Sequence, residues 1–267
     1  MDSLLAQDVE IALAAASRGS AAIKPWLGVL HEADFKGEVD PVTEVDRRSE
    51  TLIADTITSA RPNDAILAEE RGGDPLGLNR VWIIDPLDGT VNFLHGVPHV
   101  GVSVALYEKG LPRVGVVIDV FREEIFTATS GGGAFLNGEP ISVSTQDDLG
   151  AALVATGFPY DRRRHSASYA SIVGQMLNHV QGIRRMGTAS LDLAWVACGR
   201  YDAFWELKLA PWDVAAGILL IREAGGRVTD PRGVPARPGD QVSIASNAAL
   251  AVEFRGRVTS AIPSGLL

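Results

Sequence analysis

The chain of 267 residues contains only one cysteine, Cys198. A single cysteine excludes an intramolecular disulfide and a zinc site built from several cysteines, and it is typical of a reducing compartment. The sequence also lacks a run of about 20 consecutive apolar residues, the length that a membrane-spanning helix needs. Its first residues mix acids with apolar side chains, which is typical of a helix and not of a signal peptide. We therefore expect a soluble, cytoplasmic protein with no membrane partner.

Positive charge is also scarce. The chain has 24 Lys and Arg residues against 33 Asp and Glu residues, a formal net charge of −9. The longest basic run is Arg162 to Arg164, which we interpret as a solvated loop, or alternatively as a segment that reaches an anionic substrate or a partner subunit. This balance argues against nucleic acid as the main ligand.

Histidine does not indicate a metal site. We expect surface or supporting roles for all five residues, because none of them has the tight spacing of a zinc site: His31, His95, His99, His165 and His179.

Hydrophobic residues make up 46% of the chain, enough for a substantial core in one large domain or two closely joined halves. The first half predicts a helix over residues 3–30, a second helix that Thr43 and Asp46 begin in the manner of a capping box, and then a largely antiparallel sheet. From about Ala151, strands and helices alternate. We expect an α/β fold with an N-terminal α+β half over 1–148, which carries the metal-binding motif, and a C-terminal α/β half over 149–267, which completes the site.

The stretch "RVWIIDPLDGTVNF" ends an apolar run with two aspartates. Pro86 cannot donate to a strand ladder, so the strand should stop at Asp85 and the chain should turn. Asp85 and Asp88 would repel each other unless a cation or a proton lies between them, and Mg²⁺ prefers such oxygen ligands. Gly89 allows close backbone approach, and Thr90 opens a short helical segment whose N–H groups could hold an anion. A metal beside an anion is predicted, although Asp-Gly alone can be a simple turn.

Acidic residues in three other segments have both a structural and a functional interpretation. Glu69 and Glu70 follow an apolar run, as a solvated loop would. Asp213 lies in the first turn of a predicted helix, where an acid commonly complements the helix dipole. Asp46 could serve only the capping box.

Taken in order along the chain, these segments form a family pattern: "GEVDPVTEVD" (37–46), "LAEE" (67–70), "WIIDPLDGTVNF" (82–93), "MGTASLDLAWVACGRYDAFWE" (186–206) and "PWDVAAG" (211–217). Over nearly its whole length the chain resembles the inositol monophosphatase family of magnesium-dependent, lithium-sensitive phosphatases. The resemblance implies alternating αβαβα layers, a cytoplasmic hydrolase and, commonly, a homodimer.

The resemblance also implies a magnesium site. Glu69, Asp85 and the main-chain carbonyl of Leu87 match ligands of a first ion, and Asp85, Asp88 and Asp213 match ligands of a second. Asp85 would bridge the two, and a third, weaker ion near Glu69 would make two to three Mg²⁺ per site.

Substrate contacts are implied in the same way. Gly89 and Thr90 match residues whose N–H groups hold the phosphate, and Thr90 with Asp46 and Glu69 matches the catalytic group that positions the attacking water. The positions that match contacts to the alcohol part are Asp88, Gly187, Thr188, Ala189 and Glu206. Ala68 replaces a glycine that is frequent in the family, which leaves Glu69 in place.

The implied activity is Mg²⁺-dependent hydrolysis of inositol 1-phosphate to inositol and phosphate by metal-activated water. Fructose 1,6-bisphosphatase, histidinol-phosphate phosphatase and 3′-phosphoadenosine 5′-phosphate phosphatase activities are alternatives, since only the alcohol pocket would differ. A non-catalytic, metal-dependent binding protein on the same fold is an alternative of another class. Haloacid-dehalogenase phosphatases are disfavoured, because their two aspartates are two residues apart and not three.

Overall fold

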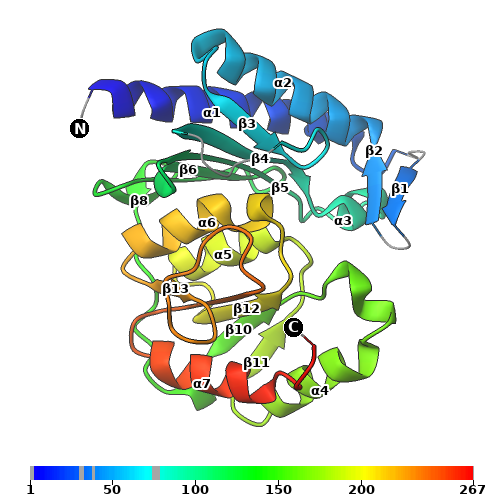
Figure 1. Cartoon of the computed structure of the whole chain (residues 1–267), viewed down its shortest axis with the longest axis vertical. Coiled ribbons are helices and arrows are strands. Elements are labelled where there is room, and N and C mark those ends of the chain that lie inside the picture. Colours follow the sequence, from blue (N-terminus) through cyan, green and yellow to red (C-terminus); the bar gives the residue numbers. More distant parts are fainter. Residues whose placement is uncertain (1–2, 30–32, 38–39, 74–78, 267) are drawn as a thin grey trace.

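The computed structural model describes residues 3–29, 33–37, 40–73 and 79–266. Its helices and sheets alternate in five layers (Figure 1). Helices α1 (Ser3–Ile23) and α2 (Glu44–Ala60) cover one face of a first sheet, and α5 (Ala189–Ala197) and α6 (Pro211–Glu223) lie between the two sheets. Helices α4 (Ser166–Met176) and α7 (Ala251–Ala261) cover the outer face of the second sheet. The predicted αβαβα arrangement is confirmed.

The first sheet has seven strands in sequence order, antiparallel except for the parallel pair β3 and β4. They are β3 (Ala65–Ala68), β4 (Arg80–Asp88), β5 (Gly101–Glu108), β6 (Leu111–Asp119), β7 (Glu124–Thr129), β8 (Gly133–Leu136) and β9 (Glu139–Pro140). A separate pair, β1 (Ala33–Gly37) and β2 (Asp40–Thr43), precedes α2, and the short helix α3 (Thr90–Leu94) follows β4.

The second sheet has five strands in the order β11-β10-β12-β14-β13. They are β10 (Leu153–Thr156), β11 (Gly182–Arg184), β12 (Ala203–Leu207), β13 (Arg227–Thr229) and β14 (Val242–Ser246). The predicted boundary at 148/149 falls between β9 and β10, and the division into two halves stays a prediction.

Three apolar clusters join the layers. One packs α1 and α2 on the first sheet, one packs α5 and α6 between the sheets, and one packs α4 and α7 on the second sheet. The middle cluster fixes the position of α6 through a close approach: a Cβ added at Gly115 of β6 would lie 3.0 Å from the carbonyl oxygen of Ala216. Because α6 carries Asp213, this contact helps to set where that carboxylate lies.

Two predicted boundaries are wrong, and proline explains both. The helix expected over 3–30 ends at Ile23, where a 3-10 turn (Lys24–Trp26) with Pro25 near its start takes over. The strand expected to stop at Asp85 continues to Asp88. Its pairing with β5 passes from Asp85 opposite Ser103 to Asp88 opposite Gly101, so three steps on β4 match two on β5. The extra residue is a bulge, where a strand tolerates proline.

Among the described residues, no helix is both long enough and apolar enough to cross a membrane.

Gly115→Ala should lower the free energy of unfolding by about 1–3 kcal/mol, because the added methyl group presses against the backbone of α6. Urea unfolding measures the change. Gly174→Ala is the control: a Cβ there meets nothing within 4 Å, and alanine should instead stabilise helix α4 by up to about 1 kcal/mol. Equal stability of the Gly115→Ala variant and the parent chain would contradict the close packing of α6 on β6.

Candidate active site

The bulge in β4 turns Asp85 and Asp88 toward the same side of the sheet. Their partners on β5, Ser103 and Gly101, are two residues apart, and residues two apart on a strand share a face. Three residues apart on a regular strand, the two aspartates would face opposite ways. The sequence spacing therefore brings the two carboxylates together only because the strand is irregular between them.

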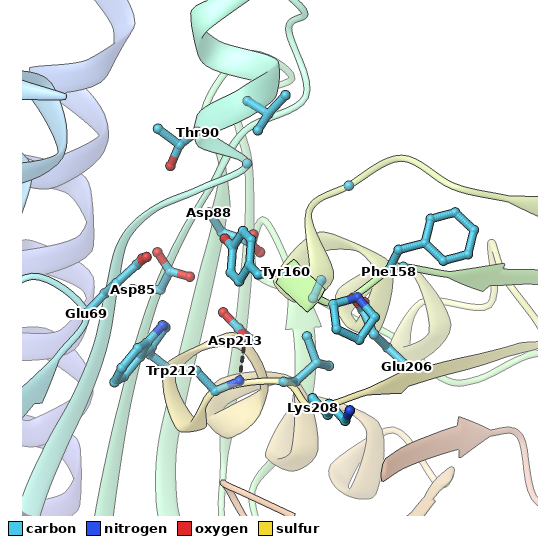
Figure 2. A pocket seen from close by; sticks show the side chains of 18 of the residues that line it. Glu69, Asp85, Asp88, Thr90, Phe158, Tyr160, Glu206, Lys208, Trp212 and Asp213 are labelled. Atoms are coloured by element: carbon cyan, nitrogen blue, oxygen red, sulfur yellow. Dashed lines mark hydrogen bonds between the residues drawn. The ribbon is translucent and has the colours of Figure 1, made fainter. Parts of the chain in front are cut away.

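Two further carboxylates reach the same cleft, which has a volume of 440 Å³. Glu69 follows β3, and Asp213 lies in the first turn of α6, where its Oδ2 accepts a hydrogen bond of 2.7 Å from the N–H of Ala210. Figure 2 shows the carboxyl groups of Glu69, Asp85 and Asp213 turned toward the same part of the cleft. Asp88 Oδ2 accepts a hydrogen bond of 2.7 Å from the N–H of Ser190, and this bond connects β4 to the start of α5.

Burial and mutual repulsion disfavour the charged forms of these groups. Burial raises the pKa of Asp85 well above its usual range, and the charges of Glu69, Asp88 and Asp213 raise it further. Burial, with Asp88 and Glu69, has the same effect on the pKa of Asp213. Burial raises the pKa of Asp88 to about 6. A cation bound among these carboxylates would relieve the repulsion.

The donor chemistry of the cluster fits Mg²⁺. All its donors are oxygens, from the four carboxylates and the buried main-chain carbonyl of Leu87, and a hard divalent cation prefers such ligands. No three His, Cys, Asp or Glu side chains of the described ranges already stand as a ligand set for one ion. The assignment of individual ligands therefore stays a prediction.

Asp46 and Thr90 meet at the edge of this cluster. Thr43 and Asp46 form the predicted capping box of α2: the Thr43 N–H donates to Asp46 Oδ2 at 2.9 Å, and the Thr43 side chain accepts from the Asp46 N–H. The other oxygen of Asp46, Oδ1, accepts a hydrogen bond of 3.0 Å from Thr90 Oγ1. Asp46 thus has both roles that its sequence position suggested, as a cap and as a partner of Thr90.

The turn at Gly89 packs against the turn before α5. Gly89 has a left-handed φ of 96°, and a Cβ there would lie 2.5 Å from Thr188 Oγ1. Asn92 Nδ2 bridges the two turns by donating to the carbonyls of His99 and Met186, at 2.9 Å each. Asn92 was not among the predicted functional residues, although it belongs to the quoted motif two positions after Thr90.

Most of the predicted site residues line the cleft: Glu69, Asp85, Leu87, Asp88, Gly89, Thr90, Gly187, Ala189, Glu206 and Asp213. Asp46 lies behind Thr90 and does not line it. Thr188 is buried, and its hydroxyl donates a hydrogen bond of 3.0 Å to the carbonyl of His99. Its side chain therefore supports the turn before α5. His99 itself is buried, and its Nδ1 lies 3.1 Å from the Arg122 guanidinium. His31 lies outside the described residues, and so do residues 38 and 39 of the first family segment.

The wall opposite the carboxylate cluster was not predicted. It follows β10 and contains Phe158 and Tyr160, with the Arg185 guanidinium 5.6 Å from the Phe158 ring centre and the Arg162 guanidinium 6.0 Å from that of Tyr160. Arg162 therefore reaches the cleft, as the alternative interpretation of the arginine run allowed. Glu206 lies on this side (Figure 2). Burial raises its pKa to about 8, against the lowering effect of Arg185 and Arg162.

Comparisons with known proteins agree with this fold. Residues 2–262 match the model of the inositol monophosphatase family. The chain is 48% identical over 200 residues to the Nus factor SuhB of Escherichia coli K12, covering 74% of this chain and 75% of that protein. It is 44% identical over 238 residues to the inositol-1-monophosphatase of Rhizobium meliloti, covering 87% and 88%.

Solved structures with the same architecture include an extragenic suppressor protein suhB from Bartonella henselae, with a TM-score of 0.87 and 37% identity over 97% of this chain and all of that one. An inositol monophosphatase from Anabaena has a TM-score of 0.87 and 38% identity over 98% of both chains.

Asp85→Asn should raise the melting temperature of the metal-free protein, because it removes a buried carboxyl whose ionised form three other carboxylates repel. Mg²⁺ should stabilise the parent chain by on the order of 5 °C at saturating concentration, and the variant much less. Thermal melts with EDTA or Mg²⁺ measure both effects. Asp192→Asn is the matched control: it removes another buried carboxyl of this region outside the predicted ligand set, and it should keep the Mg²⁺ response. A full Mg²⁺ response in Asp85→Asn would contradict the bridging role.

Proposed function

Because the chain belongs to the inositol monophosphatase family of metal-dependent phosphatases, we propose that it is a Mg²⁺-dependent phosphomonoesterase that converts inositol 1-phosphate and water into inositol and phosphate. The observation that carries the proposal is the order of groups along one cleft. The carboxylates suit a cation, the turn at Gly89 and Thr90 suits a phosphate, and Glu206 on the opposite wall suits the hydroxyl groups of an alcohol.

Glu69, Asp85 and the Leu87 carbonyl would hold one Mg²⁺, Asp85, Asp88 and Asp213 a second, and the surroundings of Glu69 a third, weaker one. Bound Mg²⁺ makes hydroxide available near neutral pH and neutralises charge on the leaving ester oxygen. The chain keeps the ligands in place through the bonds already described: Asp88 to the N–H of Ser190, and Asp213 to the N–H of Ala210.

Thr90 and Asp46 would orient the attacking water. The Thr90 hydroxyl has two acceptors for its proton, Asp46 Oδ1 at 3.0 Å and the Leu87 carbonyl at 3.2 Å, so the lone pairs of Oγ1 stay available to accept a hydrogen bond from water. A water held in this way points an oxygen lone pair away from Thr90 and toward the phosphorus. Asp46 is itself fixed by the capping box of α2, so the water position is set by a helix terminus and not by a free side chain.

The turn after β4 would bind the phosphate. The carbonyl of Gly89 accepts the first helical hydrogen bond of α3, 3.0 Å from the N–H of Phe93. The N–H groups of Gly89 and Thr90 precede that bond, so the helix itself offers them no acceptor. Oxygens of a phosphate are suitable acceptors, and the left-handed conformation of Gly89 permits the sharp turn that presents them.

A regulatory or binding role is the second candidate, and the comparisons give it a specific support. The relatives that are 48% identical carry the name Nus factor SuhB, which describes no phosphatase. Such a role would use the same fold without requiring turnover. This role involves no substrate. Within the catalytic proposal, fructose 1,6-bisphosphate, histidinol phosphate and 3′-phosphoadenosine 5′-phosphate remain alternative substrates.

Purified protein should release phosphate from inositol 1-phosphate in the presence of Mg²⁺, with a higher kcat/KM than from the other three phosphate esters. EDTA should abolish the release. Preference for another ester would correct the substrate and keep the phosphatase, while no release from any of the four would favour the binding role.

Glu206→Met should lower kcat/KM for inositol 1-phosphate about five- to thirtyfold, because it removes hydrogen bonds to the substrate hydroxyls worth about 1–2 kcal/mol. Ethyl phosphate, which has no hydroxyl group on its alcohol, should be hydrolysed as before. Initial rates on both esters measure the ratio. Equal losses on the two would show that Glu206 supports the phosphate and metal end and not the alcohol.

A further inference from the structure

Gly157 lies directly beside the carboxyl group of Glu206. It is the first residue after β10, whose last residue, Thr156, pairs in parallel with Trp205 of β12, the residue before Glu206. A Cβ added at Gly157 would lie closer than 3.0 Å to both carboxyl oxygens and to Cδ of Glu206, a separation that real Cβ atoms essentially never show. The carboxyl group occupies the space that any other side chain at position 157 would fill.

Backbone conformation does not explain this glycine. Gly89 and Gly187 have left-handed φ values of 96° and 83°, which a residue with a Cβ rarely adopts. Gly157 is not among the residues with positive φ, so other residues could take up its backbone conformation without strain. The remaining reason for a glycine at this position is space.

The backbone at Gly157 cannot easily withdraw to make room. Strand β10 lies between β11 and β12, and Thr156 Oγ1 donates 2.8 Å to the carbonyl of Trp205. The wall that continues from Gly157 is anchored as well, because Asp161 accepts hydrogen bonds from Lys208 Nζ at 2.8 Å and from Tyr169 Oη at 2.7 Å. An added methyl group would therefore displace the flexible end of Glu206, and the cleft that Glu206 lines offers open space for it.

We propose that Gly157 is a positioning residue that determines specificity. Because it has no side chain, it leaves space for the Glu206 carboxyl, and the position of that carboxyl sets the size and the hydrogen-bond geometry of the part of the cleft that binds a polyol. The role of the polyol rests on the proposed function. The space that the Glu206 carboxyl occupies beside Gly157 rests only on the packing of β10 against β12. Residue 157 acts through Glu206, so a change there affects the alcohol part of the substrate and leaves the phosphate end alone.

Gly157→Ala should raise KM for inositol 1-phosphate about tenfold, the effect of one misplaced hydrogen bond, and leave kcat/KM for ethyl phosphate within about twofold of the parent chain. In a Glu206→Ala background the same substitution should have no further effect on inositol 1-phosphate, because no carboxyl remains to be displaced. Gly182→Ala is the matched control, since a Cβ there makes only ordinary contacts on strand β11 of the same sheet. The Gly182→Ala variant should leave KM and kcat/KM unchanged for both esters.

A tenfold loss that persists in the Glu206→Ala background, or equal losses on both esters, would overturn the proposal. A crystal structure of the Gly157→Ala variant tests the role of Gly157 independently of the proposed function. We expect an unchanged β10 backbone with the Glu206 carboxyl turned into the cleft, whatever ester the enzyme prefers. An unmoved Glu206 carboxyl beside a displaced β10 would overturn the proposal even if inositol 1-phosphate is the substrate.

Discussion

The repulsion among four carboxylates gathered in one cleft, of which Asp85 is fully buried, is the constraint on which the site depends. Glu69, Asp85, Asp88 and Asp213 come from three separate segments. Burial raises the pKa of all three aspartates, and neighbouring carboxylates raise those of Asp85 and Asp213 further. Such a cluster opposes folding unless protons or cations compensate it. Under the proposed function, a divalent cation would compensate this repulsion and supply the means of activating water.

The rest of the fold holds these groups against their repulsion. The bulge at Pro86 and Leu87 places Asp85 and Asp88 on one face of β4. Helices α5 and α6, packed between the two sheets, supply N–H donors from Ser190 and Ala210 to Asp88 and Asp213. The second sheet adds the opposite wall, where Glu206 faces the cleft. The five layers therefore bring the carboxylate cluster and Glu206 to the same cleft.

Local patterns predicted much of this, and long-range pairing explains what they missed. The capping box of Thr43 and Asp46 is local in sequence, and it is present as predicted. The effect of Pro86 was predicted wrongly, because whether a proline ends a strand or sits in a bulge depends on the register with β5. Most of the predicted site residues line the cleft. Gly157 belongs to none of the family motifs, and its contact with Glu206 depends on how β10 lies beside β12, which no local pattern shows.

The most direct test of the account is a calorimetric titration of Mg²⁺ into the metal-free protein at about pH 6, near the pKa of Asp88. The titration is repeated in buffers of different ionisation enthalpy. Carboxyls whose pKa values are raised by burial and repulsion hold protons that the cation must displace. The account predicts saturable binding with a heat that changes with the buffer, in the direction of proton release. Absent binding, or a heat that is the same in every buffer, would contradict it.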